Sequence, residues 1–508
     1  MNTLSFPSVR ADGRTLIMGL GQTGVAAALW CARHGASLRV LDTRTQPDGL
    51  QSLRHQVETD RVDYRLGADT WTADALDEVH TIVLSPGLSP RDEPVRSFLA
   101  MAAQRNIELI GEIELFARAL ADMERQGYIS RLIAVTGTNG KTTVTAMVRQ
   151  LAQACGLVVQ AAGNISPAAL AALSECLKDG ALPDVWVLEL SSFQLETTYS
   201  LAPDAAVVLN ITQDHLDWHG TMQAYMAAKA RLFEMSKLAI INRDDPAVTA
   251  MVATADAADV RSFGSDLPTR GGDLGLEENN GVVWLAACQE QEPEVPMGRR
   301  RRSKVEQEPG QQGRVVRLMP VDALKLRGRH NALNALASLA LGRALGLGWA
   351  GMLSALRDYP GEPHRSEYVR SISGVDFVND SKGTNVGATV AALEGLGQRV
   401  VLIAGGLSKG QDFEPLAHAV KAHARAVLLI GQDAGILAQA LDATGVAVEQ
   451  VRTLADAVAR SMELAREGDA VLLSPACASM DMFKNYAERG DCFMAAVHEM
   501  ALDRGEVA

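Results

Sequence analysis

The sequence lacks the marks of secreted, disulfide-bonded and membrane-spanning proteins. Its six cysteines are scattered and include no C-x-x-C pair, which favours reduced thiols over disulfides or a zinc site. The N-terminus has no apolar signal-peptide segment, so we expect a cytoplasmic protein. The most apolar stretch, 332–356, is interrupted by Arg343 and several glycines, and we expect no membrane span.

An excess of positive charge is also missing, because 48 Lys and Arg residues face 61 Asp and Glu residues. The formal net charge of −13 argues against general binding to nucleic acids or anionic membranes. Four consecutive arginines occur at 299–302, but no aromatic residues interleave them. We interpret the polar, Pro- and Gly-interrupted segment around them, 285–316, as a flexible surface insertion.

What the sequence does contain is a phosphate-binding pattern. The apolar run 132–135 predicts a buried strand, 136–140 is a glycine-containing turn, and Lys-Thr-Thr at 141–143 opens a helix. Backbone N–H groups of such a turn and the dipole of the helix favour a phosphate there. The lysine reaches the β- and γ-phosphates, and a threonine hydroxyl can ligate Mg²⁺. Ala134 stands at the first glycine position of the full P-loop pattern, so the match is to a shorter G-x-x-G-K-T-T form.

A second glycine motif lies near the N-terminus. The pattern G-x-G-x-x-G at 19–24 follows the predicted strand 15–18 and precedes the predicted helix 25–34. Asp42 ends the next strand, where a dinucleotide-binding fold places its ribose ligand. These residues are compatible with NAD, with another diphosphate, or with a glycine cluster that only packs.

Two candidate metal ligands follow predicted strands in the middle of the chain. Glu189 stands near the end of the apolar run 184–190, and His215 follows the apolar run 205–210. A carboxylate and a histidine at neighbouring strand ends, close to a phosphate site, can ligate a divalent cation. Each also has a structural interpretation, Glu189 as a cap and His215 as a partly buried histidine. Lys229 would by default be a solvated lysine on a helix surface.

Length and element order predict an α/β protein of three domains. At roughly 150 residues per domain, a chain of 508 residues suggests about three. Alternating strands and helices after residue 375 predict a mostly parallel sheet, with polar residues clustered after its strand ends, where such sheets bind ligands. We predict a Rossmann-like domain at 1–119, a P-loop-type ATPase domain at 120–360 and a second Rossmann-like domain at 361–508.

Five stretches together resemble the Mur ligases, the ATP-dependent amide-forming enzymes of peptidoglycan precursor synthesis. They are TGTNGKTT (136–143), LELSSFQLE (188–196), HNALNALA (330–337), NDSKGTN (379–385) and SPACASMDMFKNYAERG (474–490). The resemblance extends through all three domains, and NDSKGTN is similar to the branch that adds D-glutamate. Three positions depart from the family pattern: Thr142 replaces a common Ser, Gly383 a usual Ala and Tyr486 a usual Phe.

The resemblance implies a role for each matching residue. The ATP phosphates would be bound by Gly137, Thr138, Asn139, Gly140, Lys141, Thr142 and Thr143, of which Lys141 and Thr142 would also hold the first Mg²⁺, while Glu189 and His215 would serve a second. The adenosine would be bound by Asn331, Asn334, Arg365 and Asp380. The catalytic set would be Lys141, Glu189, His215 and Lys229, and the metal ligands Thr142, Glu189, His215 and a carbamylated Lys229. The uridine-diphospho-sugar would contact Gln22, Thr23, Asp42, Thr43, Arg44, Ser85, Gly87 and Asn164. D-Glutamate would contact Lys382, Thr384, Lys409, Ser479 and Tyr486.

These roles imply a monomeric ATP- and Mg²⁺-dependent ligase that joins D-glutamate to UDP-N-acetylmuramoyl-L-alanine through an acyl phosphate, with no nucleic-acid partner. The glycine motif at 19–24 would then bind UDP and not NAD. One alternative is another ligase of the superfamily with a different amino-acid substrate. A nicotinamide dehydrogenase fused to a nucleotide-binding module is a second, but the sequence shows no hydride-transfer pattern. A non-catalytic ATP-regulated binding protein is a third, and it would leave Glu189, His215 and Lys229 idle.

Overall fold

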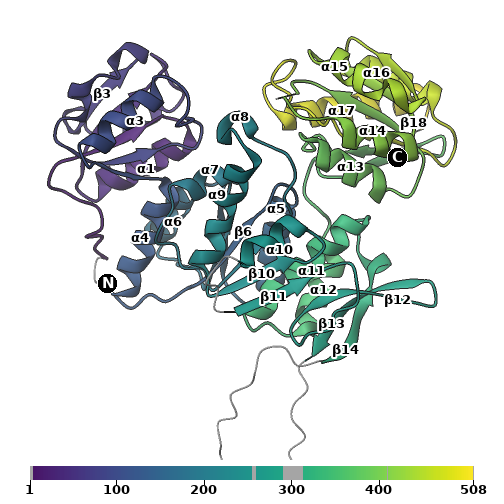
Figure 1. The fold of residues 1–508 in the computed structure, drawn as a ribbon, viewed down its shortest axis with the longest axis horizontal. Helices are drawn as coiled ribbons and strands as arrows, with labels where there is room; N and C mark the ends of the chain where they lie inside the picture. Colours follow the sequence, from purple (N-terminus) through teal and green to yellow (C-terminus); the bar gives the residue numbers. More distant parts are fainter. Residues whose placement is uncertain (1–3, 254–258, 290–312, 409, 507–508) are drawn as a thin grey trace, which may run out of the picture.

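The computed structural model describes residues 4–253, 259–289, 313–408 and 410–506, which form three α/β lobes in chain order (Figure 1). The purple N-terminal lobe and the yellow-green C-terminal lobe stand on either side of the central lobe. Each lobe is built on its own sheet, so the predicted three-part α/β architecture is confirmed. The sheets occupy 14–110, 131–320 and 367–473, while the boundaries at 119 and 360 stay predictions. No helix among the described residues is long and apolar enough to cross a membrane.

The N-terminal lobe contains a five-stranded parallel sheet. Its strands are β1 (Arg14–Met18), β2 (Ser37–Asp42), β3 (Val62–Leu66), β4 (Val79–Leu84) and β5 (Glu108–Ile110), and its helices are α1 (Gln22–Arg33), α2 (Leu50–Gln56) and α3 (Val95–Gln104). The strand order is β3-β2-β1-β4-β5. The central strands β1 and β4 are buried along almost their whole length, as expected of a parallel sheet covered on both faces.

The central lobe contains a nine-stranded sheet. Its strands are β6 (Arg131–Thr136), β7 (Val159–Gly163), β8 (Val185–Glu189), β9 (Ala205–Val208), β10 (Leu238–Asn242), β11 (Asp259–Phe263), β12 (Leu274–Asn279), β13 (Val282–Gln289) and β14 (Arg314–Pro320). The order is β14-β13-β12-β11-β10-β9-β6-β8-β7, with antiparallel pairing only between β12, β13 and β14. The phosphate-turn strand β6 therefore lies between β8, which ends in Glu189, and β9, which precedes the segment that contains His215.

Helices cover both faces of the central sheet. They are α4 (Glu112–Glu124), α5 (Lys141–Ala154), α6 (Ala169–Asp179), α7 (Ser192–Glu196), α8 (Leu216–His219), α9 (Met222–Met235), α10 (Pro246–Ala253), α11 (Arg329–Ala344) and α12 (Trp349–Asp358). Helices α5, α11 and α12 contact one another, and α9 packs against α7 and α10. The predicted Ala-rich helix pair near 332–356 is observed as α11 and α12, with α11 buried almost throughout.

The segment 285–316 departs from its expected flexibility. Residues 285–289 belong to β13 and residues 314–316 to β14, which pair as antiparallel neighbours. Leu285 and Ala287 join the central core together with Met319, and Ala286 and Cys288 between and after them are buried as well. The flexible interpretation is wrong for these two ends, because β13 and β14 pair in the sheet and both contribute apolar residues to the core. The arginines at 299–302 lie outside the described residues.

The C-terminal lobe contains a six-stranded sheet. Its strands are β15 (Glu367–Ile372), β16 (Val375–Asn379), β17 (Val400–Gly405), β18 (Ala424–Ile430), β19 (Ala447–Gln450) and β20 (Ala470–Leu473). Its helices are α13 (Val386–Gly395), α14 (Glu414–His423), α15 (Ala434–Leu441), α16 (Leu454–Leu464) and α17 (Tyr486–Asp503). The order is β15-β16-β20-β17-β18-β19, and β15 alone in this sheet pairs as an antiparallel strand.

Within the described parts of the chain, the central lobe shares an apolar core with the N-terminal lobe but not with the C-terminal lobe. One apolar core runs from α1 through α4 and α6 to β6 and β8, and contains Trp30, Phe116 and Trp186. The N-terminal and central lobes therefore share a core. The two cores of the C-terminal lobe draw their residues only from 372–501. Among the described residues, no apolar cluster spans the central and C-terminal lobes.

Glu112 is a buried carboxyl at the junction of the N-terminal and central lobes. It opens α4 and accepts a hydrogen bond from the backbone N–H of Leu170 in α6, at 2.6 Å. Burial raises its pKa from 4.5 to about 7, although the N–H groups of Leu170 and Ala169 act in the opposite direction. Because the folded-state pKa is above the unfolded value, this group's contribution to stability is complete below pH 4.5 and is lost as the pH rises through about 7.

We expect Glu112→Gln, which stays neutral, to remove this pH dependence. Between about pH 5 and about pH 8 the free energy of unfolding of the native chain should fall by about 3 kcal/mol relative to the variant. Urea unfolding of both proteins at each pH measures the difference. Glu124→Gln, at the exposed end of the same helix, is the control and should behave as the native chain does. Parallel pH profiles for native chain and Glu112→Gln would contradict the assignment.

Candidate functional site

The phosphate turn connects β6 to α5 and depends on two glycines. Gly137 and Gly140 have φ values of +147° and +85°, in the region that favours glycine. A Cβ on Gly140 would lie 2.6 Å from Asn334 Oδ1, so the turn also packs closely against α11. The Lys141 ammonium donates to the carbonyl oxygens of Gly137 at 2.9 Å and Thr138 at 2.8 Å. The sequence-predicted turn therefore presents a lysine and a helix N-terminus at one point.

Thr142 and Glu189 meet directly, as their predicted roles require. The Thr142 hydroxyl donates to Glu189 Oε2 at 2.6 Å, and Asn164 Nδ2 donates to Glu189 Oε1 at 3.0 Å. Glu189 is buried at the end of β8. Hydroxyl and carboxylate oxygens are hard ligands of the kind Mg²⁺ prefers, so this pair fits the metal that the sequence predicts.

Lys229 reaches the same turn from α9 and is buried. Its ammonium donates to Thr136 Oγ1 at 3.2 Å and to the Gly137 carbonyl at 3.0 Å, and lies 4.8 Å from the ring centroid of Tyr225. Burial and the neighbouring charge of Lys141 lower the pKa of Lys229 well below its usual value. Burial likewise lowers the pKa of Lys141. The default surface location of Lys229 is therefore wrong, because its helix packs this face against the phosphate turn.

His215 is held in an unusual backbone conformation. It has φ +53° at the start of α8, a left-handed geometry that non-glycine residues adopt at a cost. Its ring packs at 4.7 Å from that of Phe193, and its Nε2 lies 3.6 Å from Asp214 Oδ2. Among the described residues no group of three or more His, Cys, Asp or Glu side chains is placed to hold a metal.

The predicted adenosine residues line one cleft of about 280 Å³ between the central and C-terminal lobes. The central lobe contributes Asn331 and Asn334 from α11, and the C-terminal side contributes Arg365 and Asp380. Phe263 adds an apolar surface. Burial raises the pKa of Asp380 to about 6, against the hydrogen bond from Ser474. Both lobes are needed to complete this cleft.

The predicted D-glutamate residues gather around the loop after β16. The Lys382 ammonium lies 3.9 Å from the ring centroid of Tyr486, which opens α17. A Cβ on Gly383 would lie 2.6 Å from Asp380 Oδ2, so alanine would not fit here without a shift. Thr384 is held in this loop by a backbone hydrogen bond to Lys382, and Ser479 is buried in the segment after β20. Lys409 lies outside the described residues.

The N-terminal glycine turn gathers the predicted UDP residues after β1, β2 and β4. Asp42 accepts hydrogen bonds from the backbone N–H of Leu20 at 2.8 Å and from the Arg44 guanidinium at 2.9 Å. Ser85 donates to the Gly19 carbonyl at 2.9 Å. The remaining members of this set are Gln22 and Thr23 at the start of α1, Thr43 beside Asp42, and Gly87 after β4. Asn164 is separate from them, because it lies on Glu189.

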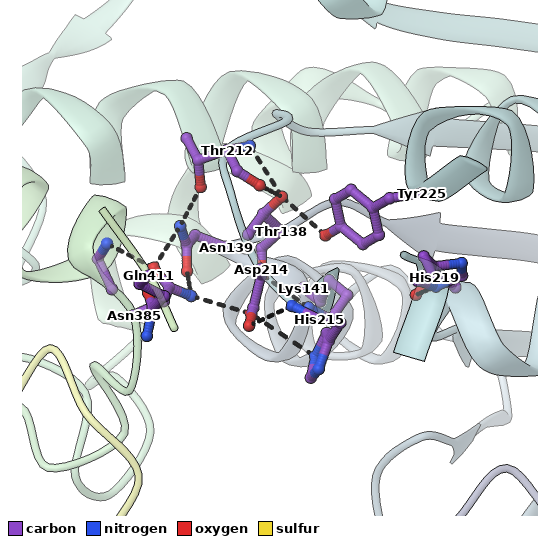
Figure 2. Close-up of polar contacts among 12 residues, drawn as sticks. Thr138, Asn139, Lys141, Thr212, Asp214, His215, His219, Tyr225, Asn385 and Gln411 are labelled. Atoms are coloured by element: carbon purple, nitrogen blue, oxygen red, sulfur yellow. Dashed lines mark hydrogen bonds and ion pairs between the residues drawn. The ribbon is translucent and has the colours of Figure 1, made fainter. Parts of the chain in front are cut away.

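Three residues of the site were not singled out from the sequence. Asp214 acts by its charge on both Lys141 and Lys229 and partly opposes the lowering of their pKa values by burial. Asn385 bonds to Asp214 and to Asn139 across the lobes (Figure 2). Arg489 is buried and donates to the Ser381 carbonyl at 2.8 Å, which ties α17 to the 379–385 loop. Asn385 and Arg489 stand within quoted motifs and Asp214 directly precedes His215, but position alone did not distinguish them from their neighbours.

Comparison with known proteins identifies one family along most of the chain. Three family descriptions match: Mur ligase MurD-like, N-terminal domain at 13–111, Mur ligase middle domain at 135–342, and Mur ligase, glutamate ligase domain at 364–477. The chain is 63% identical over 98% of both chains to UDP-N-acetylmuramoylalanine--D-glutamate ligase of Bordetella avium. It is 50% identical, again over 98% of both, to the protein of the same name in Paraburkholderia xenovorans.

Solved structures with the same fold are more distant in sequence. MurF ligase from Thermotoga maritima, in complex with ADP, matches with a TM-score of 0.56 and 17% identity over 99% of this chain and 98% of that one. UDP-N-acetylmuramate-alanine ligase MurC from the same organism matches with a TM-score of 0.54 and 18% identity, over 96% of this chain and 99% of that one. At this identity the likeness concerns the fold.

Proposed function

The chain belongs to the Mur ligase family, and from this premise we infer that it is an ATP-dependent ligase that joins D-glutamate to UDP-N-acetylmuramoyl-L-alanine in peptidoglycan precursor synthesis. Relatives that match along nearly the whole chain at 61–63% identity carry that name. The structural observation that carries the inference is the meeting of the phosphate turn and the 379–385 loop at one cleft.

The reaction has to convert a carboxylate, which is a poor electrophile, into an amide. The alanyl carboxylate of the sugar substrate attacks the γ-phosphorus of ATP, the bond to the β-phosphate oxygen breaks, and an acyl phosphate and ADP form. The neutral amine of D-glutamate attacks the acyl carbon, and the resulting tetrahedral centre expels phosphate. The amine loses one proton to solvent or to a nearby base in this second step.

The phosphate turn supports the first step by electrostatics. We assign the Lys141 ammonium and the N–H groups at the start of α5 to the ATP phosphates, where positive charge opposes the charge that builds up during transfer. Thr142 and Glu189 would hold Mg²⁺, which when bound offsets phosphate charge. His215 would orient the acyl group, since its strained backbone and the Phe193 ring fix its direction.

Lys229 is proposed to work as a carbamate. Burial and the charge of Lys141 lower the pKa of Lys229 well below its usual value and so favour the neutral amine, which adds to CO₂ and releases one proton. The product is an anion on the Lys229 side chain, whose nitrogen lies 3.0 Å from the Gly137 carbonyl oxygen and near enough to Glu189 to feel its charge. An anion at this position would complete the metal ligands together with Thr142, Glu189 and His215.

The 379–385 loop is proposed to recognise D-glutamate. Lys382 supplies a cation for one carboxylate, and the hydroxyl groups of Thr384 and Ser479 supply donors for the other. The Tyr486 ring supports the Lys382 ammonium. Lys409, which the family pattern assigns to the same ligand, belongs to this proposal by sequence only.

Phosphate release tests the function. With ATP, Mg²⁺ and UDP-N-acetylmuramoyl-L-alanine, we expect release that requires D-glutamate and that is lost with L-glutamate, L-alanine or meso-diaminopimelate. Release with another of these amino acids would keep the ligase and change its substrate, pointing to Gly383 and Tyr486. No release with any of them, from folded protein supplied with bicarbonate, would favour a non-catalytic ATP-regulated protein.

A further inference from the structure

The C-terminal lobe meets the phosphate turn through one helix end. Helix α13 follows the 379–385 loop directly, and its N-terminal residues Gly387 and Ala388 line the nucleotide cleft. The two lobes share no described apolar core, in contrast to the N-terminal and central lobes. The relative position of the C-terminal lobe therefore depends on polar and steric contacts, which include those at this helix and a hydrogen bond from the Asp412 backbone N–H to Gln213 Oε1 at 3.2 Å.

Asn385 makes the most direct of these contacts. Its side-chain amide pairs reciprocally with that of Asn139 in the phosphate turn: Asn385 Nδ2 donates to Asn139 Oδ1 at 3.0 Å, and Asn139 Nδ2 donates to Asn385 Oδ1 at 3.3 Å (Figure 2). Asn385 Nδ2 also lies 3.3 Å from Asp214 Oδ2. Asn385 is 4% exposed, so these bonds are shielded from water.

Asn385 also begins the helix whose position it fixes. Its Oδ1 accepts the backbone N–H of Ala388 at 2.9 Å and so caps α13. One side chain therefore connects the helix start, the phosphate turn and Asp214. Asp214 in turn acts by its charge on Lys141 and Lys229. The amide of Asn385 links the lobe that carries Lys382 and Thr384 to the groups proposed to handle phosphate.

Two residues after Asn385, the backbone of Gly387 approaches the side chain of Thr212 so closely that no side chain fits between them. A Cβ on Gly387 would lie 2.8 Å from Thr212 Oγ1 and 3.2 Å from its Cβ. Thr212 belongs to the central lobe and accepts a hydrogen bond from Asn139 at 3.4 Å. At the other end of α13, a Cβ on Gly395 would lie 2.9 Å from the His330 ring in α11. Helix α13 therefore rests on the central lobe at both ends through glycine.

We propose that Asn385 is a positioning residue that holds the C-terminal lobe in a defined position on the phosphate turn. This registration of the lobe also needs Gly387, which allows α13 to approach Thr212 closely. The proposal rests on the proposed function, because its consequence is to hold the 379–385 loop and its ligand against the activated carboxylate. A displacement of about 1 Å between reacting groups is enough to cost a factor of about a hundred in rate. Asn385 itself need not touch a substrate.

Two substitutions of Asn385 separate registration from helix capping. Serine and aspartate both keep a cap for α13, but serine is too short for the amide pair, and aspartate cannot donate to Asn139 or Asp214. We expect Asn385→Ser to lower kcat/KM for D-glutamate by about tenfold or more, and Asn385→Asp to lower it further because it faces Asp214. The KM for the UDP-sugar should stay unchanged, because its proposed ligands lie in other lobes.

The glycine contact allows a test in which activity should fall while stability is retained. Gly387→Ala replaces glycine in a helix, so α13 itself should not be destabilised. The added methyl group should nevertheless separate α13 from Thr212 and lower kcat/KM for D-glutamate by about tenfold or more. Gly435→Ala is the matched control, because Gly435 is also the second residue of a C-terminal-lobe helix and has no atom within 4 Å of its Cβ position.

The outcomes are distinct from those of the function test. If the native chain releases phosphate with D-glutamate, the function stands whatever the variants do. Reduced kcat/KM in Asn385→Ser and Gly387→Ala, with native melting temperatures and a native Gly435→Ala control, would support registration. A larger radius of gyration of the ADP-bound variants in solution scattering is expected with it. Native kinetics in both variants, or equal losses in Gly387→Ala and Gly435→Ala, would overturn the proposal.

Discussion

Lys141→Ala is expected to lower ATP-dependent phosphate release by about a thousandfold. The lysine is the only side chain of the described phosphate turn that brings a positive charge to the N-terminus of α5, and its ammonium is already directed over the turn by the carbonyls of Gly137 and Thr138. Removing it leaves the charge that develops on the transferred phosphoryl group without its nearest cation. The loss should therefore appear mainly in kcat.

Steady-state phosphate release at saturating substrates measures this effect. Lys237→Ala is the control, because Lys237 lies in the same lobe, is largely exposed and pairs with Asp204 away from the turn. It should retain native activity, and both variants should melt near the native temperature. Near-native turnover by Lys141→Ala would remove the phosphate turn from the proposed mechanism.

Lys229→Ala is expected to cause a loss of a few hundredfold or more, of the order found when one charged group is removed from a catalytic centre. The residue would no longer supply the anion that carbamylation creates. A small carboxylate such as formate could enter the space left by the side chain, and we expect it to restore part of the activity. The native chain should lose activity in CO₂-free buffer and regain it with bicarbonate.

A carbon-13 resonance of a carbamate in the native protein, formed from labelled bicarbonate and lacking in Lys229→Ala, is the direct measurement. Because the amine must be neutral to react, this signal should grow as the pH rises through the lowered pKa of Lys229. Full activity of the native chain without CO₂, together with no carbamate resonance, would exclude the modification and leave Lys229 as a structural amine.

The sequence predicted the fold well where short apolar runs end in small or charged residues. The strands at 132–135, 184–190 and 205–210 are observed as β6, β8 and β9, and they are neighbours in the sheet. Carboxyl ends of neighbouring parallel strands meet at one edge. For that reason Lys141, Glu189 and the segment before His215 come together although they are far apart in the chain.

Features that depend on packing between distant segments were harder to predict from the sequence. From its place on a helix, Lys229 is expected to be a surface residue. It is buried because that face of its helix packs against the phosphate turn. The hairpin β13–β14 was hidden because a long polar segment separates its two strands. Asn385 follows Thr384 in a quoted motif, but its partner Asn139 is 246 positions away in the chain. No short sequence pattern around Asn385 predicts this contact. Contacts between lobes depend on rigid-body placement, which no short pattern encodes.

The nucleotide cleft is a property of the assembled lobes and belongs to neither lobe alone. Asn331 and Asn334 come from one side and Arg365 and Asp380 from the other. A compound that fills the cleft would therefore contact both lobes at once and stabilise their association. Its apparent affinity would include the free energy of bringing the lobes together. Screening against the central lobe by itself would miss such compounds. Variants that loosen α13 should bind them more weakly and so identify inhibitors that depend on both lobes.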